Sequence, residues 1–345
     1  MIDPLESAEE AGLTYVTDTA PGIRRKRKGK GFVYVDDQKG PVRDKKVLER
    51  IRALVIPPAW EDVWICRQRN GHLQVTGRDA RGRKQYRYHE DWTVIRNGNK
   101  FDRMAKLARK LPHLRRKIAA DLRRKGHPKE KILAAVVKVM LLTQSRVGNS
   151  AYAEENDSYG LTTIKNKHAK IRGTKIRLSF KGKSGVDHDI QFQDPALSRI
   201  IRRCQELPGE ELFAYMSDEG EAVDVNSTHV NEYLRSVTGE DFTAKDLRTW
   251  GGTCKAVEIL VQEIPLDCSK EKHWLKRHLT VIKETARHLH NTVAVCRKYY
   301  IHPVVFEADK KGRLHEVWKS CAKCGKSISR EEKLLIELLC RKARA

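Results

Sequence analysis

The feature that most limits the fold of this chain is a change in hydrophobic period near residue 92. Before it, short runs with strand character prevail, as from Phe32 to Val35, and such runs are typical of β-strands. Beyond Trp92, apolar residues recur every three to four positions, which is the period of an amphipathic helix. The sequence therefore predicts an α+β protein with a small β-rich N-terminal domain and a larger, mainly α-helical domain.

The N-terminal domain is expected to be a small sheet with one helix. Helical spacing covers residues 46–56 and ends at Pro57-Pro58, because proline cannot continue a helix. Asn70-Gly71 lies in a loop between two strand patterns and is a hairpin signal. The strand patterns lie at residues 32–35, 63–66, 72–76 and 85–89.

The larger domain is expected to contain one short sheet, at residues 160–193. Within it, Ile176, Leu178 and Phe180 alternate with polar residues, and a turn at 181–185 presents lysines at the tip of a β-hairpin. We expect helices at residues 101–111, 113–125, 128–143, 195–207, 226–237, 244–263, 271–289 and 292–300. The chain then divides into an acidic and then basic N-terminal arm at 1–30, the β-rich domain at 31–91, the α-helical domain at 92–320 and a helical tail at 321–345.

The charge of the chain predicts a polyanionic partner. Its 345 residues include 69 Lys and Arg against 45 Asp and Glu, a net charge of +24, which favours nucleic acid first and an acidic lipid surface second. Basic runs at 24–30 and 103–131 are expected to contact phosphates. A merely solvated basic surface is the alternative that charge alone leaves open.

Several classes of protein are not expected. The best apolar run, from Ile132 to Leu142, is shorter than the ~20 residues of a membrane span and contains Lys138. The N-terminus is acidic without a signal-peptide pattern, and the eight cysteines lack the spacing of a disulfide framework. We therefore expect a cytoplasmic protein with reduced thiols and no membrane association.

No cofactor is expected. The chain contains neither of the glycine-rich phosphate-binding patterns, G-x-x-x-x-G-K-[ST] and G-x-G-x-x-G, so neither ATP nor a dinucleotide is expected to take part. Cys321 and Cys324 are one half of a zinc site, and His315 and Cys340 are unpatterned partners for them. We predict no metal and interpret the two cysteines as incidental thiols.

The larger domain contains the residue types that metal-free phosphodiester chemistry needs. These are fixed cations around the phosphate, a side-chain nucleophile and a proton donor for the leaving oxygen. Arg146 and Arg248 can each donate planar, bidentate hydrogen bonds to phosphate oxygens, and Lys183 lies in the hairpin turn. The candidate nucleophiles are Tyr299 and Tyr300.

Ordered sequence blocks carry a specific resemblance. Those in the larger domain are Q-S-R-V-G-N, L-T-T-I-K-N-K-H, K-G-K, K-D-L-R-T-W and N-T-x-x-V-x-R-K-x-Y-I-H-P; those in the N-terminal domain are I-P-P-A-W and G-H-L-Q-V-T-G-R-D-A-R-G-R-K-Q-Y. Over about residues 30–305 the chain resembles the type IB DNA topoisomerases of the compact bacterial and poxvirus kind.

The resemblance implies a catalytic set of Arg146, Lys183, Arg248, Asn291 and Tyr300. Tyr300 would attack a DNA phosphodiester, leaving a 3′-phosphotyrosyl link and a free 5′-hydroxyl. Lys183 would be the general acid for the 5′-oxygen, and the two arginines would bind the non-bridging oxygens. The interval from Asn291 to Tyr300 matches that of the family, which favours Tyr300 over its neighbour as the nucleophile; Lys181 is the corresponding alternative to Lys183.

The chain departs from the family pattern around Asn291. Poxvirus and nuclear relatives generally carry histidine at this position. Because an amide can donate a hydrogen bond but cannot titrate, Asn291 is expected to act as an oxyanion donor rather than as a proton carrier. His290 and Val293 also replace a glycine and a proline that are usual in bacterial relatives.

The resemblance further implies a DNA-binding surface on each domain. The two domains would close around double-stranded DNA as a C-shaped clamp, and the protein would act as a monomer in the bacterial cytoplasm, at the nucleoid. The expected DNA-binding residues are Arg78, Arg81, Arg83, Lys84, Gln85, Tyr86, Lys165, Lys167 and His168.

The function implied is the relaxation of positive and negative supercoils by cleavage of one strand, strand rotation and religation, without ATP or metal. A tyrosine recombinase or integrase shares this chemistry, but its second arginine usually belongs to His-x-x-Arg, where this chain has Lys245-Asp246-Leu247-Arg248. Its N-terminal domain is also helical. The remaining alternative, an architectural DNA-binding protein without activity, explains the charge but not the catalytic set.

Overall fold

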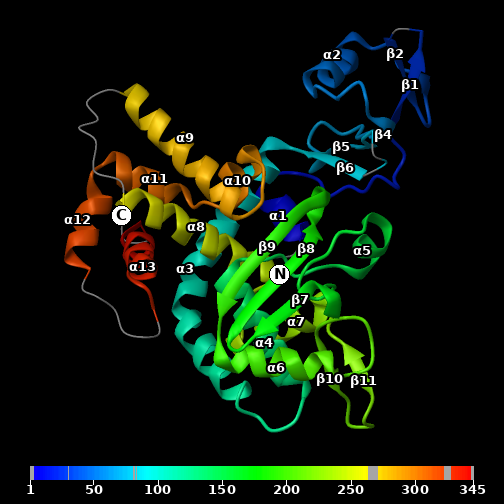
Figure 1. Cartoon of the computed structure of the whole chain (residues 1–345). Helices are drawn as coiled ribbons and strands as arrows, with labels where there is room; N and C mark the ends of the chain where they lie inside the picture. The colour runs from blue at the N-terminus through cyan, green and yellow to red at the C-terminus, as the bar shows by residue number, and fades with distance from the viewer. Residues whose placement is uncertain are drawn as a thin grey trace. The chain divides into compact units, whose positions relative to one another are not determined.

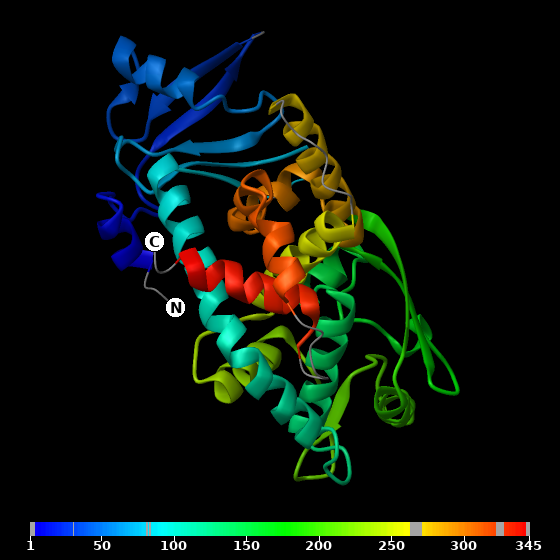
Figure 2. The same ribbon diagram turned by 90° about the vertical axis from the view of Figure 1, so that its left-hand side faces the viewer.

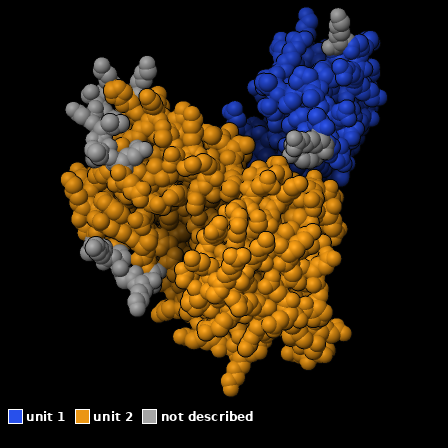
Figure 3. All heavy atoms as spheres, in the orientation of Figure 1, with its two compact units in different colours: residues 1–102 blue, residues 103–345 orange. Residues whose placement is uncertain are grey.

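The structure of the chain is a computed structural model, which describes residues 4–29, 31–80, 82, 84–262, 271–321 and 328–342. The chain forms two compact units, residues 1–102 (unit 1) and 103–345 (unit 2) (Figures 1 and 3). The long helix α3 (Glu90–Asp121) begins where the hydrophobic period of the sequence changes. The predicted α+β class is confirmed, with strands dominating unit 1 and helices dominating unit 2. Within the described residues, no helix is both long enough and apolar enough to span a membrane.

Unit 1 is built on one antiparallel sheet with the strand order β3-β2-β1-β4-β5-β6. Two helices, α1 (Pro4–Glu10) and α2 (Lys45–Ala53), belong to the same unit. The strands and the helix predicted for this part of the sequence are all present. The strands are β1 (Ile23–Lys28), β2 (Gly31–Asp36), β3 (Gly40–Pro41), β4 (Glu61–Ile65), β5 (Leu73–Arg78) and β6 (Lys84–Tyr88).

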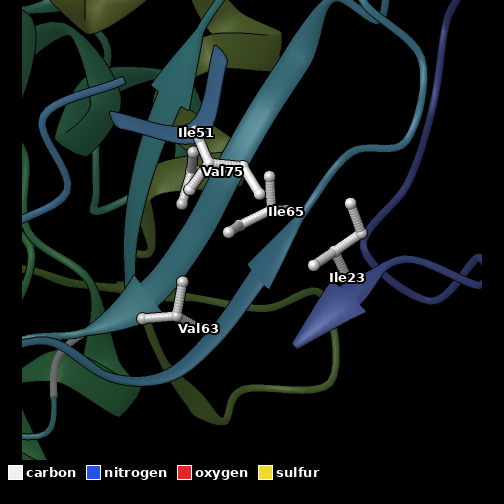
Figure 4. Close-up of a cluster of buried hydrophobic side chains, with 5 residues drawn as sticks. All are labelled: Ile23, Ile51, Val63, Ile65 and Val75. Atoms are coloured by element: carbon white, nitrogen blue, oxygen red, sulfur yellow. The ribbon is translucent and has the colours of Figure 1, made fainter. Parts of the chain in front are cut away.

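The core of unit 1 joins helix α2 to the sheet. Ile23, Val63, Ile65 and Val75 come from strands β1, β4 and β5, and they pack with Ile51 of α2 (Figure 4). None of the five is more than 2% exposed. Burying a side chain of this size contributes about 1.5–3 kcal/mol, so this small unit has a hydrophobic core of its own.

The basic segment 24–28 is a strand, whereas the sequence predicts a basic N-terminal arm there. It forms β1, which pairs along its whole length with β2 and at its start with β4. Gly29, at φ 56°, allows the chain to reverse between β1 and β2. The guanidinium of Arg25 lies 4.2 Å from the centroid of the Phe32 ring. Because only Ile23 of this strand is buried, its sequence shows charge and no apolar alternation.

Helix α3 runs without a break through Pro112, where the sequence predicted a boundary between two helices. Proline removes one backbone donor and usually breaks a helix. Leu111 and Leu114, on either side of this position, are buried. Packing of this face therefore offsets the missing hydrogen bond, and α3 is one helix as far as Asp121.

The other helices of unit 2 include most of those predicted and three short ones, α5, α11 and α12, that were not. These three have seven or eight residues each, too few for a clear periodic signal. The helices beyond α3 are α4 (Lys129–Thr143), α5 (Ser150–Asn156), α6 (Pro195–Gln205), α7 (Ser227–Thr238), α8 (Ala244–Gln262), α9 (Glu271–His288), α10 (Val293–Tyr299), α11 (Pro303–Lys310), α12 (Arg313–Ser320) and α13 (Arg330–Lys342).

A three-stranded antiparallel sheet with the order β7-β8-β9 interrupts these helices, as predicted. Strand β8 alternates strictly, with Ile176, Leu178 and Phe180 buried. The strands are β7 (Ala169–Arg172), β8 (Lys175–Gly182) and β9 (Val186–Gln193), with a smaller pair β10 (Ala214–Met216) and β11 (Ala222–Asp224); single 3₁₀ turns lie at η1 (Asn166–His168) and η2 (Lys183–Gly185).

The C-terminal helix α13 is part of the packing of unit 2 and not a free tail. Leu334 and Leu335 are fully buried. Glu332 accepts hydrogen bonds from the Arg115 guanidinium of α3 at 2.6 and 2.9 Å and from the Trp250 indole of α8 at 2.9 Å. Figure 2 shows α13, in red, lying across α3. The predicted helical character of segment 321–345 is therefore present at 330–342, and residues 322–327 and 343–345 lie outside the described part.

Candidate active site

Four of the five predicted catalytic residues line one cavity of about 580 Å³ in unit 2. They are Arg146, Lys183, Arg248 and Tyr300, which lie far apart in the sequence. The remaining lining residues are Ser145, Val147, Gly148, Asn149, Tyr152, Ser158, Tyr159, Gly160, Ala244 and Lys245. The fifth predicted residue, Asn291, lies next to the cavity through its contact with Arg146.

The loop that carries Arg146 is fixed by backbone pairing. Helix α4 ends at Thr143, and Gln144, with φ 49°, turns the chain out of the helix. The Arg146 carbonyl then accepts from the Leu161 amide at 2.9 Å, and the Val147 carbonyl accepts from the Thr162 amide at 2.6 Å. A Cβ at Gly160 would clash with the backbone of this loop. The block L-T-T thus holds the block Q-S-R-V-G-N in place.

The two terminal nitrogens of the Arg146 guanidinium differ in their hydrogen bonding. Its Nη2 donates to the His290 carbonyl at 3.1 Å and to Oδ1 of Asn291. Its Nη1 is buried and has no hydrogen-bond partner among the described residues. Burial lowers the pKa of Arg146, but an arginine in a protein stays protonated at neutral pH. The free Nη1 is therefore a charged donor at the wall of the cavity.

Arg248 is more deeply buried, with 5% of its surface exposed. It projects from α8, and its two terminal nitrogens donate to the carbonyls of Gln144 and Leu289. Its Nε is buried without a partner among the described residues. Burial, and then the charge of Arg146, lower the pKa of Arg248 to about 10, so it remains a cation at pH 7. Its Cζ lies 5.5 Å from the centroid of the Tyr300 ring.

Asn291 follows a left-handed residue at the end of helix α9. His290 has φ 47°, a conformation that glycine adopts more readily. The Asn291 amide donates to the Ala286 carbonyl at 2.9 Å. Since Oδ1 accepts from Arg146, Nδ2 is the side chain's remaining donor, and it is buried without a partner among the described residues.

Tyr300 is positioned at the end of helix α10. Its amide donates to the Cys296 carbonyl at 2.9 Å, and its own carbonyl accepts from the Thr253 hydroxyl of α8 at 3.3 Å. Gly252 allows this close approach, because a Cβ there would lie 2.8 Å from the Tyr300 carbonyl oxygen. The neighbouring Tyr299 is absent from the residues that line the cavity. Its ring lies 5.4 Å from the Lys298 ammonium instead.

Lys183 lies in the tight turn between β8 and β9. The turn has left-handed residues at Ser184, φ 68°, and Gly185, φ 73°. Below it, the His188 ring stacks on the Phe180 ring, with centroids 4.9 Å apart, and approaches the His290 ring at 4.1 Å. A Cβ at Gly182 would clash with the His188 imidazole, so this ring fits tightly against the strand that leads to Lys183.

His188 is a site residue that the sequence analysis missed. It is buried, and burial followed by the charges of His290, Arg146 and Arg248 lowers its pKa to about 4. The imidazole is therefore neutral at pH 7. Its position five residues after Lys183 does not by itself indicate a role in the site. Only the pairing of β8 with β9 shows that His188 lies opposite Phe180.

The predicted DNA-binding residues of unit 1 lie on β5, β6 and the loop between them. Arg78 lies 3.6 Å from the Asp62 carboxylate and donates to the Gly82 carbonyl at 2.9 Å. Lys84 pairs with Asp18 at 2.6 Å. Gln85 donates to Asp79 at 2.9 Å, and Tyr86 stacks on Tyr88 with centroids 6.1 Å apart. Arg81 and Arg83 lie outside the described residues.

The predicted DNA-binding residues of unit 2 lie beside the cavity and do not line it. Lys165 forms an ion pair with Glu210, and Lys167 is exposed. The His168 ring lies 4.8 Å from that of Tyr159, which does line the cavity. Tyr152, Tyr159 and Lys245 were missed as lining residues, although Tyr159 and Lys245 stand within or next to recognised blocks of sequence.

Metal ligands do not gather in the described part of the chain, where no three His, Cys, Asp or Glu side chains form a candidate site. Cys321 is buried, and its thiol donates a hydrogen bond to the Glu337 carboxylate with Sγ and Oε1 3.7 Å apart. Its predicted neighbour Cys324 lies outside the described residues.

Comparison with known proteins matches most of the chain to DNA topoisomerases. Residues 89–325 match the family model of eukaryotic DNA topoisomerase I, catalytic core, and residues 31–79 match that of bacterial DNA topoisomerase IB, N-terminal domain. DNA topoisomerase 1B of Acanthamoeba polyphaga mimivirus is 32% identical over 285 residues, which cover 81% of this chain and 85% of that protein. DNA topoisomerase 1B of Vaccinia virus (strain Copenhagen) is 24% identical over 280 residues, covering 77% of this chain and 83% of that protein.

Among solved structures, the XerH site-specific recombinase bound to difH substrate matches with a TM-score of 0.35 and 14% identity. This match covers 59% of the chain and 51% of the recombinase chain. A likeness at this level carries no argument about the fold.

Proposed function

Because the chain belongs to the type IB DNA topoisomerases, we propose that Tyr300 is the nucleophile with which it cleaves one DNA strand. The protein is a DNA topoisomerase, an isomerase that acts on DNA, and its N-terminal domain is of the bacterial type. Tyr300 lines the same cavity as two buried arginines and Lys183, whereas Tyr299 does not line it. This placement supports Tyr300 over its neighbour.

The observation that carries the proposal is a set of free donors. Nη1 of Arg146, Nε of Arg248 and Nδ2 of Asn291 are all buried and without a partner among the described residues. A buried donor left unpaired costs about 1–3 kcal/mol, so three of them around one cavity indicate a site that is completed by a ligand. A DNA phosphate supplies oxygen acceptors and the negative charge that two arginines favour.

These donors stabilise the transition state of the proposed step. The phenol oxygen of Tyr300 forms a bond to phosphorus as the bond from phosphorus to the 5′-oxygen breaks, and the phenol proton is lost to solvent. A phenol is a weak acid, so the developing charge on the non-bridging oxygens must be met by donors that are already in place. The hydrogen bonds that Arg146 and Arg248 make to protein carbonyls hold the guanidinium groups in that position.

Lys183 is the proposed general acid. It lines the cavity from the turn between β8 and β9, and its ammonium would give a proton to the departing 5′-oxygen. The reverse reaction returns that proton to Lys183 as the 5′-hydroxyl attacks the phosphotyrosyl bond. Because this bond conserves the energy of the phosphodiester, religation needs neither ATP nor metal, and rotation between the two steps relaxes supercoils of either sign.

The test is covalent trapping on nicked or supercoiled DNA with sodium dodecyl sulfate. Wild-type protein and Tyr299→Phe are expected to form the DNA adduct, and Tyr300→Phe is expected to form none. An adduct with Tyr300→Phe, or its loss with Tyr299→Phe alone, would contradict the assignment. Tyr299→Phe is a matched control because it removes the same hydroxyl from the adjacent position.

Product topology separates the remaining alternatives. A tyrosine recombinase requires paired sites, whereas a topoisomerase relaxes a plasmid without them; an architectural DNA-binding protein forms no adduct. We further propose that the protein acts as a monomer on duplex DNA held by both of its units, in the cytoplasm at the nucleoid. Sedimentation of the complex with a short duplex tests the monomer directly.

A further inference from the structure

A second cavity in unit 2, of about 490 Å³, is lined by ten residues, of which six are Lys or Arg and four are apolar. It lies among the C-terminal end of α3, helix α4 and helix α6. Its lining residues are Ala119, Leu122, Arg123, Arg124, Lys131, Lys138, Ala196, Arg199, Ile200 and Arg203. No acidic side chain is among them, which is unusual in a surface where charges of both signs normally mix.

Part of this charge is balanced by neighbouring carboxylates, and part is not. Arg124 pairs with Asp121 at 2.9 Å, and Lys138 pairs with Asp194 at 2.5 Å. The other four cations, Arg123, Lys131, Arg199 and Arg203, have no carboxylate partner among the described residues. The cavity therefore gathers an excess of positive charge, in which Arg123, Arg199 and Arg203 are exposed and Lys131 is buried.

Lys131 makes this arrangement costly without an anion. It is 8% exposed, and its ammonium donates to the carbonyls of Arg124 at 2.8 Å and Gly126 at 2.9 Å. An ammonium has three donors, so one remains. Burial and then the charge of Arg203 lower the pKa of Lys131, and burial, Lys131 and Arg203 lower that of His127. An anion in the cavity would offset the repulsion between these cations.

This cavity is separate from the catalytic one. The two share no lining residue. Strand β8 has eight residues and separates the Lys183 turn from the end of the sheet where α6 begins, a distance of about 25 Å at the rise of a strand. Figure 1 shows α6 beyond the far end of β8 and β9. Lys131 lies near the start of α4, about 20 Å along the helix axis from Gln144.

We propose that this basic cavity is a second phosphate-binding site of the protein, distinct from the catalytic cavity. Phosphate oxygens accept from guanidinium forks and from ammonium groups, and four unbalanced cations match a multiply charged phosphate or neighbouring phosphates of a nucleic acid strand. The same chemistry is offered by a DNA backbone and by a free polyphosphate. The basic run 103–131 of the sequence thus contributes cations to a defined site as well as to the surface of α3.

The first test is calorimetric titration of the full-length protein with inorganic pyrophosphate. Arg199→Ala/Arg203→Ala removes two exposed cations of the cavity, and Arg202→Ala, on the same helix but outside the cavity, is the matched control. The double variant is expected to bind pyrophosphate about tenfold more weakly or worse, and Arg202→Ala as tightly as wild type. Equal affinity of all three proteins, or no binding at all, overturns the proposal.

The second arm identifies the source of the phosphate. Duplex DNA binding is measured against salt concentration with each protein carrying Tyr300→Phe in addition, so that no cleavage takes place. If the cavity holds DNA phosphates, the double variant lowers the slope of log K against log salt by about 2 relative to the control. If the slope is unchanged while pyrophosphate binding is lost, a free polyphosphate is the ligand. Neither result depends on the proposed role of Tyr300, because the titration needs no reaction.

Discussion

Glu332 holds the C-terminal helix against the helix that carries Arg248, and its removal tests how unit 2 is held together. Its carboxylate accepts from both terminal nitrogens of Arg115, from the Trp250 indole and from the Ser329 amide at 3.0 Å. The last contact is half of a capping box, since the Glu332 amide donates to the Ser329 hydroxyl at 3.2 Å. Trp250 lies two residues after Arg248 on α8, so one carboxylate connects α3, α8 and α13.

The expected loss in Glu332→Ala follows from these partners. Breaking a buried ion pair costs about 3–5 kcal/mol, because the remaining charge loses its partner. The Arg115 side chain is 29% exposed and the Glu332 side chain 9%, so solvent compensates part of the loss and the lower end of that range applies. The Trp250 indole and the Ser329 amide lose their acceptor as well, and a buried donor left unpaired costs about 1–3 kcal/mol. The Ser329 hydroxyl still caps the helix. We expect a loss of at least about 3 kcal/mol, a fall in Tm of about 10 °C or more.

The assay is thermal unfolding followed by circular dichroism at pH 7. Glu331→Ala is the matched control, because Glu331 occupies the same first turn of α13 and forms no ion pair with another described residue. It should change stability by no more than about 0.5 kcal/mol. Burial raises the pKa of Glu332, but Arg115, Trp250 and Ser329 outweigh this and hold it below its ordinary value of 4.5. The advantage of wild type over Glu332→Gln is therefore present above pH 4.5 and lost as the pH falls below it. Equal Tm values for Glu332→Ala and Glu331→Ala would refute this reasoning.

Three further predictions concern the candidate active site. Asn291→His keeps a donor and should retain substantial cleavage, whereas Asn291→Leu should lose about 10²–10³-fold in the cleavage rate; near-total loss in the histidine variant contradicts the donor role. Lys183→Ala should slow cleavage by about 10²–10⁴-fold. A DNA substrate with sulfur in place of the 5′-leaving oxygen needs no proton on departure, so it should restore the cleavage rate of this variant. No rescue would contradict the role of Lys183 as general acid. His188 has a pKa of about 4 against an ordinary 6.5, so the unfolded state takes up a proton first and stability falls between these pH values. Between pH 7 and pH 4.5 the free energy of unfolding should therefore fall by about 2–3 kcal/mol less in His188→Phe than in wild type. Urea unfolding at the two pH values measures this difference. An equal fall in both proteins would contradict a buried neutral imidazole.

The sequence predicted the residues that line the cavity better than it predicted the contacts that hold them in place. Arg146, Lys183, Arg248 and Tyr300 were predicted because each stands in a recognisable block, and the fold brings all four to one cavity. Which donors remain free there depends on side-chain contacts across distant segments. That Asn291 accepts from Arg146, leaving its own Nδ2 unpaired, has no signature in the sequence.

The errors in the fold have a common physical cause. The cationic strand β1 and the proline within α3 both violate local preferences, and in both cases contacts with residues elsewhere in the fold decide the structure. Arg25 of β1 packs on the Phe32 ring, and the leucines beside Pro112 are buried in the core of unit 2. Local sequence patterns do not contain such contacts, so strand β1 was not predicted and helix α3 was predicted as two helices.

The most direct test of the account is plasmid relaxation in the presence of EDTA and without ATP, with wild type and Tyr300→Phe side by side. Wild-type protein is predicted to relax both positively and negatively supercoiled plasmid under these conditions. Tyr300→Phe is predicted to bind the plasmid with unchanged affinity and to leave its topology unaltered. Relaxation by Tyr300→Phe, or a requirement of the wild type for ATP or a divalent metal, would contradict the proposed mechanism.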